Sequence, residues 1–383
     1  MNGLQRFDDT YGHTPIRKAF EEGDVYGVAY DSTRAALKPI RLGVIGAGGV
    51  AQSKYFPAVA RLRMIWEPVE ISAFAEPRTE HVDKVQAIYG GQAYADYREM
   101  LRAEPLDGVM VLSPDGLHRE HVLACIEAGL PVLVEKHIAR SLADAVQICE
   151  AADAAKLLMM TVANKRYSPP YRRARTLLDR GAVGAPALMT GKFNLGYNYV
   201  DLLEAGTIHL FDLTLYLMGA VTRVNAAGMK RKPGGDYPID NAVVMLEFAS
   251  GAVGSLTTSA TALSLKPWER VEIYGEHAWL SVEDQYALTL YGGEVEGAQS
   301  WRPVVPNTQL FDEEFGGYMG IVENFCQCIR GEETPLVTGW DGCRAYELLT
   351  AVHLSLARRT PVDLPLPDPA AADAEVYAWL KRS

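Results

Sequence analysis

A lysine in the first half of the chain has the chemistry of an acid/base group. Lys136 lies in the sequence Glu135-Lys136-His137 and directly follows the apolar run Pro131–Val134. Such a run predicts a buried strand, and open α/β sheets bind ligands at the carboxyl ends of their strands. An amine shielded from water at this place is suited to exchange a proton with a reacting hydroxyl group. A surface lysine that merely follows a strand is the other interpretation.

A glycine-rich turn predicts a dinucleotide site. Residues 46–51, Gly-Ala-Gly-Gly-Val-Ala, follow the apolar run Ile40–Ile45 and open a helix-like stretch. The first glycine permits a turn that a β-carbon would block, and the second lets the backbone approach a pyrophosphate. The helix N-terminus then faces the negative charge. A structural glycine turn is the alternative, but strand–turn–helix context favours a nicotinamide dinucleotide held by Gly46, Gly48, Gly49 and Val50.

Two charged residues after the next apolar run bear on which cofactor is used. The run Val69–Ala75 predicts a second strand, and Glu76 follows it where an acid takes the ribose hydroxyls. A carboxylate there repels the 2′-phosphate of NADP, whereas Arg78 could bind that phosphate. We predict NAD, with NADP as the alternative. A solvated acid at a strand end is the interpretation without a ligand.

A further strand end supplies the remaining predicted cofactor contacts. Ser113 and Pro114 follow the run Gly108–Leu112, and His118 begins the next helix-like stretch. The position of Ser113 and Pro114 after a buried strand places them among the expected cofactor contacts. His118 either flanks the cofactor as well or caps the helix.

Elements of two kinds must position these residues. Up to about residue 163, apolar strands alternate with helices, which is typical of a parallel sheet covered on both faces. After about residue 185, strands recur mostly without helices between them, which is typical of an antiparallel sheet. We therefore expect an α/β Rossmann domain and an α+β domain with a large, mostly antiparallel open sheet. The expected division is an N-terminal extension or arm at 1–38, the dinucleotide-binding domain at 39–163 and the substrate-binding and oligomerisation domain at 164–383.

The apolar runs and helix-like stretches predict eleven strands and seven helices along the chain. Strands are expected at Ile40–Ile45, Val69–Ala75, Gly108–Leu112, Pro131–Val134, Leu157–Ala163, Ala187–Phe193, Thr222–Met229, Ala242–Phe248, Val253–Ser259, Arg270–Tyr274 and Ala287–Tyr291. Helices are expected up to Arg63 and at Thr79–Tyr89, His118–Ala128, Ser141–Ala155, His209–Met218, Gly320–Arg330 and Gly342–Ala357.

Composition excludes several classes of function. The net charge of −11 argues against a nucleic-acid partner, whose phosphates favour a basic face. No apolar run is long enough to span a membrane, and residues 1–15 lack the apolar core of a signal peptide. The five cysteines are few and odd in number, so we expect buried thiols rather than a disulfide framework or a metal site. A cytoplasmic protein is the expectation.

Short segments spread over the chain carry a resemblance to a known family. They are the glycine turn, Tyr94–Tyr97, Leu106–Val109, Ser113-Pro114 with His118, Ala128–Lys136, Asn164–Pro169, Gly181–Gly184, His209–Leu213, Asp240-Asn241 and Gly251–Gly254. Together, from residue 41 to about 360, they resemble the Gfo/Idh/MocA oxidoreductases, a family of sugar and cyclitol dehydrogenases. The resemblance implies hydride transfer between a nicotinamide and a secondary alcohol of a sugar, polyol or sugar derivative.

The resemblance also implies roles for single residues. Glu135 would lie near the nicotinamide ribose, and Lys136 matches the lysine of the family's Glu-Lys-Pro motif, an acid/base that also positions the substrate. His209 matches a histidine that contacts the reacting hydroxyl. Asp212 matches an acidic residue one turn later, for which a structural role fits as well as a substrate contact.

The sequence departs from the family pattern at two positions. His137 replaces the proline of Glu-Lys-Pro, so this turn is either freer or uses His137 to touch the ligand. Ala205 stands where many members carry an aspartate four residues before the histidine, on the same helix face. The carboxylate that would orient the imidazole is therefore missing, and Glu204 or Asp201 are its possible substitutes.

Further candidates come from residues that could line a polar pocket. Arg166 could meet an anionic group or form a structural salt bridge, and Tyr318 could approach the nicotinamide. Asn194 and Tyr197 could bind sugar hydroxyls or simply be exposed at a strand end.

Three questions on partners and chemistry stay open. A flat sheet face must be covered, so a homodimer or homotetramer is expected. Residues 1–38 are either an arm that packs on a partner subunit or a loose leader. Two other functions are kept as alternatives: an enzyme that uses bound NAD for transient oxidation in a hydrolytic or epimerising cycle, and a non-catalytic dinucleotide-binding regulator.

Overall fold

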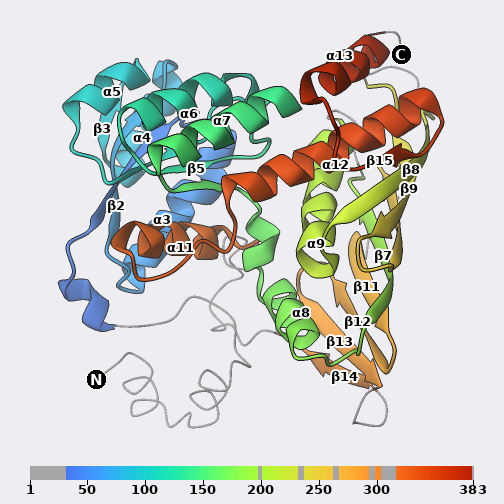
Figure 1. Cartoon of the computed structure of the whole chain (residues 1–383). Coiled ribbons are helices and arrows are strands. Elements are labelled where there is room, and N and C mark those ends of the chain that lie inside the picture. The colour runs from blue at the N-terminus through green and yellow to red at the C-terminus, as the bar shows by residue number, and fades with distance from the viewer. Residues whose placement is uncertain are drawn as a thin grey trace, which may run out of the picture. The chain divides into compact units, whose positions relative to one another are not determined.

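The computed structural model describes residues 32–196, 201–231, 237–261, 267–292, 298–302 and 316–381. Most of the predicted N-terminal extension and the candidate Tyr197 lie outside these residues. The chain divides into two compact units (Figure 1). Unit 1 holds the described residues of 1–140, 144–168 and 304–342, and unit 2 those of 141–143, 169–303 and 343–383. A late segment of the chain thus returns to the first unit.

Within the described residues, unit 1 contains a six-stranded parallel sheet in the order β3-β2-β1-β4-β5-β6. This strand order is that of a Rossmann fold and confirms the expected parallel sheet. Because all strands run the same way, the turns after their carboxyl ends meet at one edge. The strands are β1 (Ile40–Ile45), β2 (Val69–Ala75), β3 (Gln92–Tyr94), β4 (Gly108–Val111), β5 (Val132–Val134) and β6 (Met159–Thr161).

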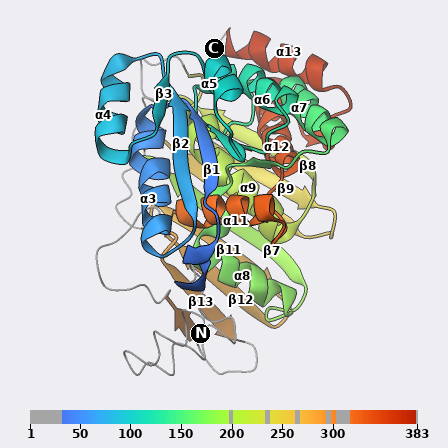
Figure 2. The same ribbon diagram turned by 90° about the vertical axis from the view of Figure 1, so that its left-hand side faces the viewer.

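Helices cover both faces of this sheet, as Figures 1 and 2 show. On one face lie α3 (Phe56–Met64) and α11 (Tyr318–Arg330), whose apolar residues join Leu42 and Val44 of β1 in one core. On the other lie α5 (Tyr97–Ala103), α6 (His118–Glu127) and α7 (Leu142–Ala155). The helix α4 (Thr79–Tyr89) packs beside β3. Cover on both faces explains why the central strands β4 and β5 are apolar and buried at every position rather than alternating.

Helix α11 packs closely on β4 although about 200 residues of sequence separate them. A β-carbon built on Gly108 would lie 2.8 Å from Cδ1 of Ile329 and 3.1 Å from Cζ of Phe325. Only a glycine lets the helix approach the strand to this distance. Phe325 is fully buried, so α11 is part of the core of unit 1 rather than an appendage.

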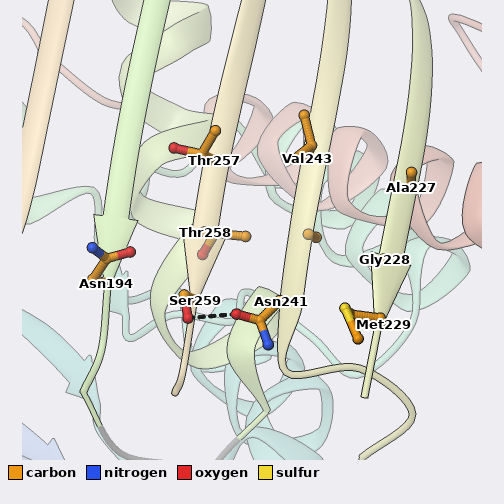
Figure 3. Close-up of a pocket in the computed structure, with 10 residues that line it drawn as sticks. Asn194, Ala227, Gly228, Met229, Asn241, Val243, Thr257, Thr258 and Ser259 are labelled. Atoms are coloured by element: carbon orange, nitrogen blue, oxygen red, sulfur yellow. Dashed lines mark hydrogen bonds between the residues drawn. The ribbon is translucent and has the colours of Figure 1, made fainter. Parts of the chain in front are cut away.

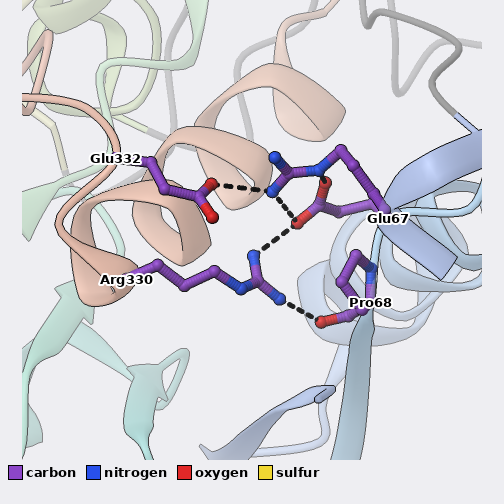
Figure 4. Close-up of polar contacts among 5 residues, drawn as sticks. Glu67, Pro68, Arg330 and Glu332 are labelled. Carbon is purple, nitrogen blue, oxygen red and sulfur yellow. Dashed lines mark hydrogen bonds and ion pairs between the residues drawn. The ribbon is translucent and has the colours of Figure 1, made fainter. Parts of the chain in front are cut away.

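An ion-pair cluster joins three segments of unit 1 (Figure 4). Glu67, only 3% exposed, accepts a 2.6 Å hydrogen bond from Nε of Arg34 and a 2.7 Å bond from Nη1 of Arg330. Arg34 lies in the first described turn, and Arg330 ends α11. Arg34 also reaches Glu332 through Nη2 at 2.9 Å. A buried carboxylate shared by two guanidinium groups is fully paired, which its desolvation requires.

The described residues of unit 2 form a nine-stranded sheet in the order β14-β13-β12-β11-β7-β10-β9-β8-β15. Only β7 and β10 pair in parallel among these strands, which confirms the expected, mostly antiparallel sheet. The strands are β7 (Pro186–Asn194), β8 (Val221–Met229), β9 (Asn241–Phe248), β10 (Val253–Ser259), β11 (Glu269–Gly275), β12 (Ala278–Glu283), β13 (Ala287–Gly292), β14 (Ala298–Trp301) and β15 (Val362–Asp363).

One face of this sheet is covered and the other is open. Along β9, Val244 and Leu246 are buried, whereas Val243 and Met245 are 48% and 60% exposed. The covered face carries α8 (Pro169–Asp179) and α9 (Ile208–Met218), which Figure 1 shows alongside the strands. Two later helices, α12 (Gly339–Arg358) and α13 (Pro369–Leu380), complete the described residues, and Ser355 of α12 accepts a hydrogen bond from the amide of Ala226 on β8.

Several short elements were not predicted from the sequence. They are β3, α5, α8, β12, β14 and β15. The strand β12 is buried at four of six positions and therefore lacks the alternation that marks a half-exposed strand. Helix α8 begins with two prolines, which the first turn of a helix tolerates but which argue locally for a loop.

The cysteines are mostly buried, as expected. Cys125, Cys149, Cys326 and Cys343 are buried free thiols, and Cys328 is half-buried. Within the described ranges, the helices are all too short or too polar to cross a membrane.

Candidate functional site

Four of the predicted cofactor segments follow strands of the same parallel sheet. The glycine turn follows β1, Glu76 follows β2, Ser113 comes after β4, and Glu135 and Lys136 follow β5. The structure therefore brings these segments to one edge of unit 1. This edge is where open α/β sheets bind their ligands.

The backbone of Gly46 has a conformation that only glycine adopts without strain. Its φ is +93°, and a β-carbon there would lie 2.7 Å from the Cα and the amide nitrogen of Ser113. A β-carbon built on Gly48 would lie 3.3 Å from Nη2 of Arg78, whereas one built on Gly49 would meet no atom within 4 Å. The turn thus presents bare backbone, which is the surface that a pyrophosphate needs. A π-helical turn at Ala51–Tyr55 links it to α3.

The carboxylate of Glu76 is buried against the glycine turn. Its Oε2 accepts a 3.0 Å hydrogen bond from the amide of Ala47, and its Oε1 accepts a 2.8 Å bond from Nε of Arg78. Burial opposes the charged form, but the hydrogen bonds from Arg78 outweigh it and keep the pKa of Glu76 below its ordinary value. The carboxylate is therefore ionised at neutral pH, with Arg78 held beside it.

His118 neither projects into solvent nor caps a helix. It is the first residue of α6, is 1% exposed, and lies between two backbone carbonyls. Nδ1 is 2.6 Å from the carbonyl oxygen of His137, and Nε2 is 2.8 Å from that of Ser113. The hydroxyl of Ser113 in turn bonds Nδ1 of His121 at 2.8 Å.

Glu135 is buried and bonded to a residue that the sequence did not single out. Tyr55, fully buried at the end of the π-helical turn, donates from its hydroxyl to Oε1 of Glu135 at 3.2 Å. Burial raises the pKa of Glu135, although the neighbouring Lys136 and the hydrogen bond from Tyr55 partly lower it. The only sequence signal for Tyr55 is its place one helical turn beyond the dinucleotide motif. Lys136 itself is half-buried, and its peptide bond to His137 is cis.

Tyr318 lies against the same tyrosine. The rings of Tyr318 and Tyr55 meet edge to face with centroids 5.4 Å apart, and Nζ of Lys54 lies 5.8 Å from the centroid of Tyr318. Gly317, at φ +80°, packs so closely on the carbonyl of Asn164 that a β-carbon would occupy its place. The start of α11 is therefore fixed against the turn after β6, close to Tyr55.

Arg166 is buried in that turn and forms an ion pair. Its Nη1 lies 3.4 Å from Oδ1 of Asp341, and its side chain is 6% exposed. An ion pair of this kind is what the structural alternative for Arg166 expects, and a contact with substrate stays a prediction. Asn164, which was not among the candidates, donates from Nδ2 to the carbonyl of Gly316 at 2.6 Å.

In unit 2, His209 and Asp212 lie on α9. His209 is half-buried and Asp212 is buried, one turn later. Asp201 accepts hydrogen bonds at 2.8 Å from the amides of Leu203 and Glu204, so its carboxylate caps the start of this helical segment. Its charge also raises the pKa of His353, although burial lowers that pKa overall. Asp201 thus has a capping role besides any substitution for the aspartate that Ala205 replaces.

Asn194 lies on the face of the sheet opposite α9. It pairs in register with Ser259, whereas the preceding Phe193 faces Gly206 just before α9. The structure therefore does not bring Asn194 next to His209. Instead, Asn194 lines a shallow groove of about 420 Å³ on the open face (Figure 3). The groove has an apolar floor that includes Val243 and Met229, and the hydroxyl of Ser259 donates to Oδ1 of Asn241 at 2.6 Å.

Metal ligands do not gather in the part of the chain that the structure describes: it holds no group of three or more histidine, cysteine, aspartate or glutamate side chains arranged for an ion. The site at the edge of unit 1 is instead built from backbone amides, the buried carboxyl groups of Glu76 and Glu135, and a lysine. This donor set suits an uncharged or anionic organic ligand.

Comparison with protein families agrees with this geometry. A family model described as an oxidoreductase family with an NAD-binding Rossmann fold matches residues 40–163. A second, described as the C-terminal alpha/beta domain of the same oxidoreductase family, matches residues 202–364. The chain belongs to the Gfo/Idh/MocA family. It is therefore an NAD-binding oxidoreductase, and the bare glycine turn next to Glu76 fits a dinucleotide.

Curated members of the Gfo/Idh/MocA family are similar along most of the chain. Myo-inositol 2-dehydrogenase of Thermotoga maritima is 27% identical over 339 residues, which cover 85% of this chain and 98% of that protein. D-apiose dehydrogenase of Paraburkholderia graminis is 26% identical over 312 residues, 77% of this chain and 83% of that protein.

Solved structures share the fold. A complex of levoglucosan dehydrogenase with NADH and levoglucosan superposes with a TM-score of 0.77 at 20% identity, covering 86% of this chain and all of that one. A probable dehydrogenase from Thermotoga maritima superposes with a TM-score of 0.71 at 25% identity, covering 85% and 99% of the two chains.

Proposed function

We propose that this protein transfers a hydride reversibly between NAD and a secondary alcohol of a sugar, polyol or cyclitol, with Lys136 as the acid/base. The observation that carries the proposal is the position of Lys136. It follows β5 at the same sheet edge as the glycine turn, next to the buried Glu135. An amine at the ligand edge of the sheet is suited to exchange a proton with a reacting hydroxyl.

The residues of unit 1 would divide the work of binding. Backbone amides of Gly48 and Gly49 would receive the pyrophosphate, and the ionised Glu76 would take the ribose hydroxyls. Bound NAD would supply the hydride acceptor. Ser113, Pro114 and Glu135 remain predicted cofactor contacts at the same edge, whereas the ring of His118 is occupied by two backbone carbonyls.

Lys136 would exchange the proton of the substrate hydroxyl as the hydride leaves or arrives. His209 is proposed to assist it, and Asp212, Arg166, Tyr318 and Tyr197 remain substrate candidates. Because Ala205 supplies no carboxylate, Lys136 would carry more of the proton chemistry than in relatives that have an aspartate there. For Asn194, a substrate contact has less support, since it lies on the sheet face opposite α9.

The names of similar proteins support the substrate class. Myo-inositol 2-dehydrogenase acts on a cyclitol and D-apiose dehydrogenase on a sugar, and both are similar to this chain along most of their length. A ring carbon that carries a hydroxyl is common to both substrates. We propose the same chemical unit as the substrate here.

Lys136→Ala tests the catalytic proposal. With a substrate found by screening polyols, aldoses and sugar acids with NAD and NADP, turnover read at the NADH absorbance band should fall about 100-fold to 10,000-fold. Lys136→Arg should fall similarly, because it keeps the charge but not a transferable proton. Lys84→Ala, at an exposed position of α4, is the matched control and should turn over as wild type. A Lys136→Ala protein as fast as wild type would disprove the assignment.

The same screen separates the two other functions. Consumption of substrate without net NADH, by a protein that keeps NAD after dilution, would indicate transient oxidation within a hydrolytic or epimerising cycle. Tight NAD binding without turnover of any compound would indicate a regulator. Either result would replace the dehydrogenase proposal.

We further propose that the open sheet face of unit 2 is covered in a homodimer or homotetramer. Exposed apolar side chains support this, among them Met245 at 60% and Val253 at 49%. Met245→Lys should therefore lower the mass measured by light scattering, whereas Met64→Lys, at a position of α3 that is 68% exposed, should not. Deleting residues 1–31 tests whether they form an arm that contacts a partner subunit. A change to a smaller oligomer in light scattering would support such a contact, and an unchanged oligomeric state would support a loose leader.

A further inference from the structure

The imidazole of His118 contacts both turns that carry predicted site residues after β4 and β5. Its Nδ1 lies 2.6 Å from the carbonyl oxygen of His137, the residue after Lys136. Its Nε2 lies 2.8 Å from the carbonyl oxygen of Ser113. At 1% exposure, the ring has no access to bulk water that could replace either contact.

One of these carbonyls lies beside the glycine turn, and the other lies beside Lys136. Ser113 packs against the glycine turn so tightly that a β-carbon on Gly46 would lie 2.7 Å from its backbone. His137 directly follows Lys136, so a hydrogen bond to its carbonyl restrains the backbone next to the lysine. The ring of His118 therefore lies between Ser113, which packs against the glycine turn, and the turn that bears Lys136.

We infer that His118 is a positioning residue whose ring lies between the turn after β5, which bears Lys136, and the turn after β4, which bears Ser113. It donates to the carbonyl of His137 when neutral and to both carbonyls when protonated. The inference rests on the proposed function, because the role of Lys136 gives this positioning its purpose. His118 would touch neither substrate nor cofactor. This differs from the cofactor contact and the helix cap that the sequence suggested for it.

The protonation of the ring decides how many carbonyls it holds. A carbonyl oxygen only accepts hydrogen bonds, and a neutral imidazole has one N–H group, so only the imidazolium donates to both. Burial lowers the pKa of His118, although both carbonyls and Asp115 act in the opposite direction. At neutral pH the ring is therefore neutral, and we assign its one proton to Nδ1, which makes the shorter contact, with His137.

Other titratable and charged groups lie near the ring of His118. Asp115 lies in the 3-10 turn before α6, and His121 follows one turn later on α6 itself. From the segment after β5, Nδ1 of His137 lies 4.0 Å and Nη1 of Arg140 3.9 Å from the carboxylate of Asp115. Among these, Asp115 favours the imidazolium, and His121 disfavours it when protonated.

Two conservative substitutions separate positioning from simple packing. The amide nitrogen of asparagine is bonded to Cγ, as Nδ1 is, whereas that of glutamine lies one bond further, as Nε2 does. His118→Asn should therefore keep the donor to His137, whereas His118→Gln loses that donor and presents one to Ser113 instead. His118→Phe keeps the ring volume and neither donor. His121→Asn is the matched control, since His121 is also buried on the same helix and contacts the Ser113 side chain instead.

The readout is hydrogen–deuterium exchange of residues 135–140, without any substrate, together with acylation of Lys136 measured by mass spectrometry. In His118→Phe and His118→Gln, exchange of 135–140 should rise about fivefold, the ratio expected for one lost hydrogen bond. Acylation of Lys136 should rise with it, and His118→Asn and His121→Asn should stay near wild type. Equal effects of Asn and Gln, or no effect of Phe, would overturn the inference.

A pH arm tests the second contact. As the pH is lowered from about 7.5 to well below the ordinary histidine pKa of about 6.5, because burial lowers the pKa of His118, exchange of residues 112–117, corrected for its intrinsic pH dependence, should slow in wild type. It should not slow in His118→Asn, which cannot gain a second donor. If exchange of residues 112–117 changed equally with pH in both proteins, the contact between protonated His118 and the carbonyl of Ser113 would be disproved. These measurements need no turnover, so an active Lys136→Ala protein would reject the proposed function while leaving the positioning contact measurable.

Discussion

The hydroxyl of Tyr55 donates a 3.2 Å hydrogen bond to Oε1 of Glu135, and both side chains are buried. The bond connects the π-helical turn that follows the dinucleotide motif with the residue before Lys136. Burial raises the pKa of Tyr55 and, despite Lys136, that of Glu135. A buried carboxyl group with a raised pKa depends strongly on the donors it keeps.

Replacing Tyr55 by phenylalanine should show this dependence. The variant leaves a buried acceptor without its donor, so the free energy of unfolding in urea should fall by about 1–2 kcal/mol. Tyr97→Phe is the matched control, because the Tyr97 hydroxyl donates to Glu120, whose side chain is 52% exposed and can bind water instead. A loss as large in Tyr97→Phe as in Tyr55→Phe would show that burial of Glu135 does not matter.

The pair of Glu76 and Arg78 should set the preference between NAD and NADP. Glu76→Ala removes the carboxylate that repels a 2′-phosphate and releases the guanidinium of Arg78, which Glu76 now holds at 2.8 Å. The ratio of the dissociation constants for NAD and NADP should shift toward NADP by about tenfold or more, since one lost charged interaction is worth about 1.4 kcal/mol. Calorimetric titration of both nucleotides measures it. An unchanged ratio would rule out Glu76 as the discriminating residue.

Gly46→Ala should destabilise unit 1 even without cofactor. The backbone at φ +93° is strained for alanine, and the new methyl group would lie 2.7 Å from Ser113. We expect the unfolding free energy to fall by at least about 2 kcal/mol. Gly49→Ala, which meets no atom within 4 Å, should change it little. If both variants unfolded at the same urea concentration, the tight approach of Gly46 and Ser113 would be refuted.

Acid should destabilise the protein partly through His121. Burial lowers the pKa of His121 to about 4, so the unfolded chain, with an ordinary pKa of 6.5, binds the proton first. The free energy of unfolding therefore falls as the pH is lowered from 6.5 toward 4, by at most about 3 kcal/mol for this shift. His121→Asn should flatten the curve of unfolding free energy against pH in this window. His277→Asn removes an exposed histidine and should leave the curve as steep as in wild type.

The local part of the site was predictable from the sequence. The turn at Gly46, the acid at Glu76 and the lysine after β5 each follow from a short pattern, since glycine conformation and strand ends depend on neighbouring residues. The parallel sheet followed from the alternation of apolar runs and helices. The cofactor class came from the same patterns, and the family model agrees with it.

The rest depends on contacts between distant residues. No pattern around His118 shows that its ring meets the carbonyl of His137, 19 residues away. Likewise, the sequence places Asn194 at the end of a strand but does not show on which face of the sheet its side chain lies. The bond between Tyr55 and Glu135 spans 80 residues and depends on how α3 lies on the sheet.

The packing of α11 on β4 has a consequence for the order in which the protein can fold. The ribosome releases the chain from the N-terminus, and Gly108 emerges long before Phe325 and Ile329, which cover it. While the sheet of unit 2 is being synthesised, the parallel sheet of unit 1 therefore has one face partly exposed to solvent. Over the same period Glu67 lacks its ion pair with Arg330. Unit 1 therefore begins to form first but is completed only after most of unit 2 has been synthesised. During that interval its exposed apolar surface is a binding site for chaperones that shield such surfaces.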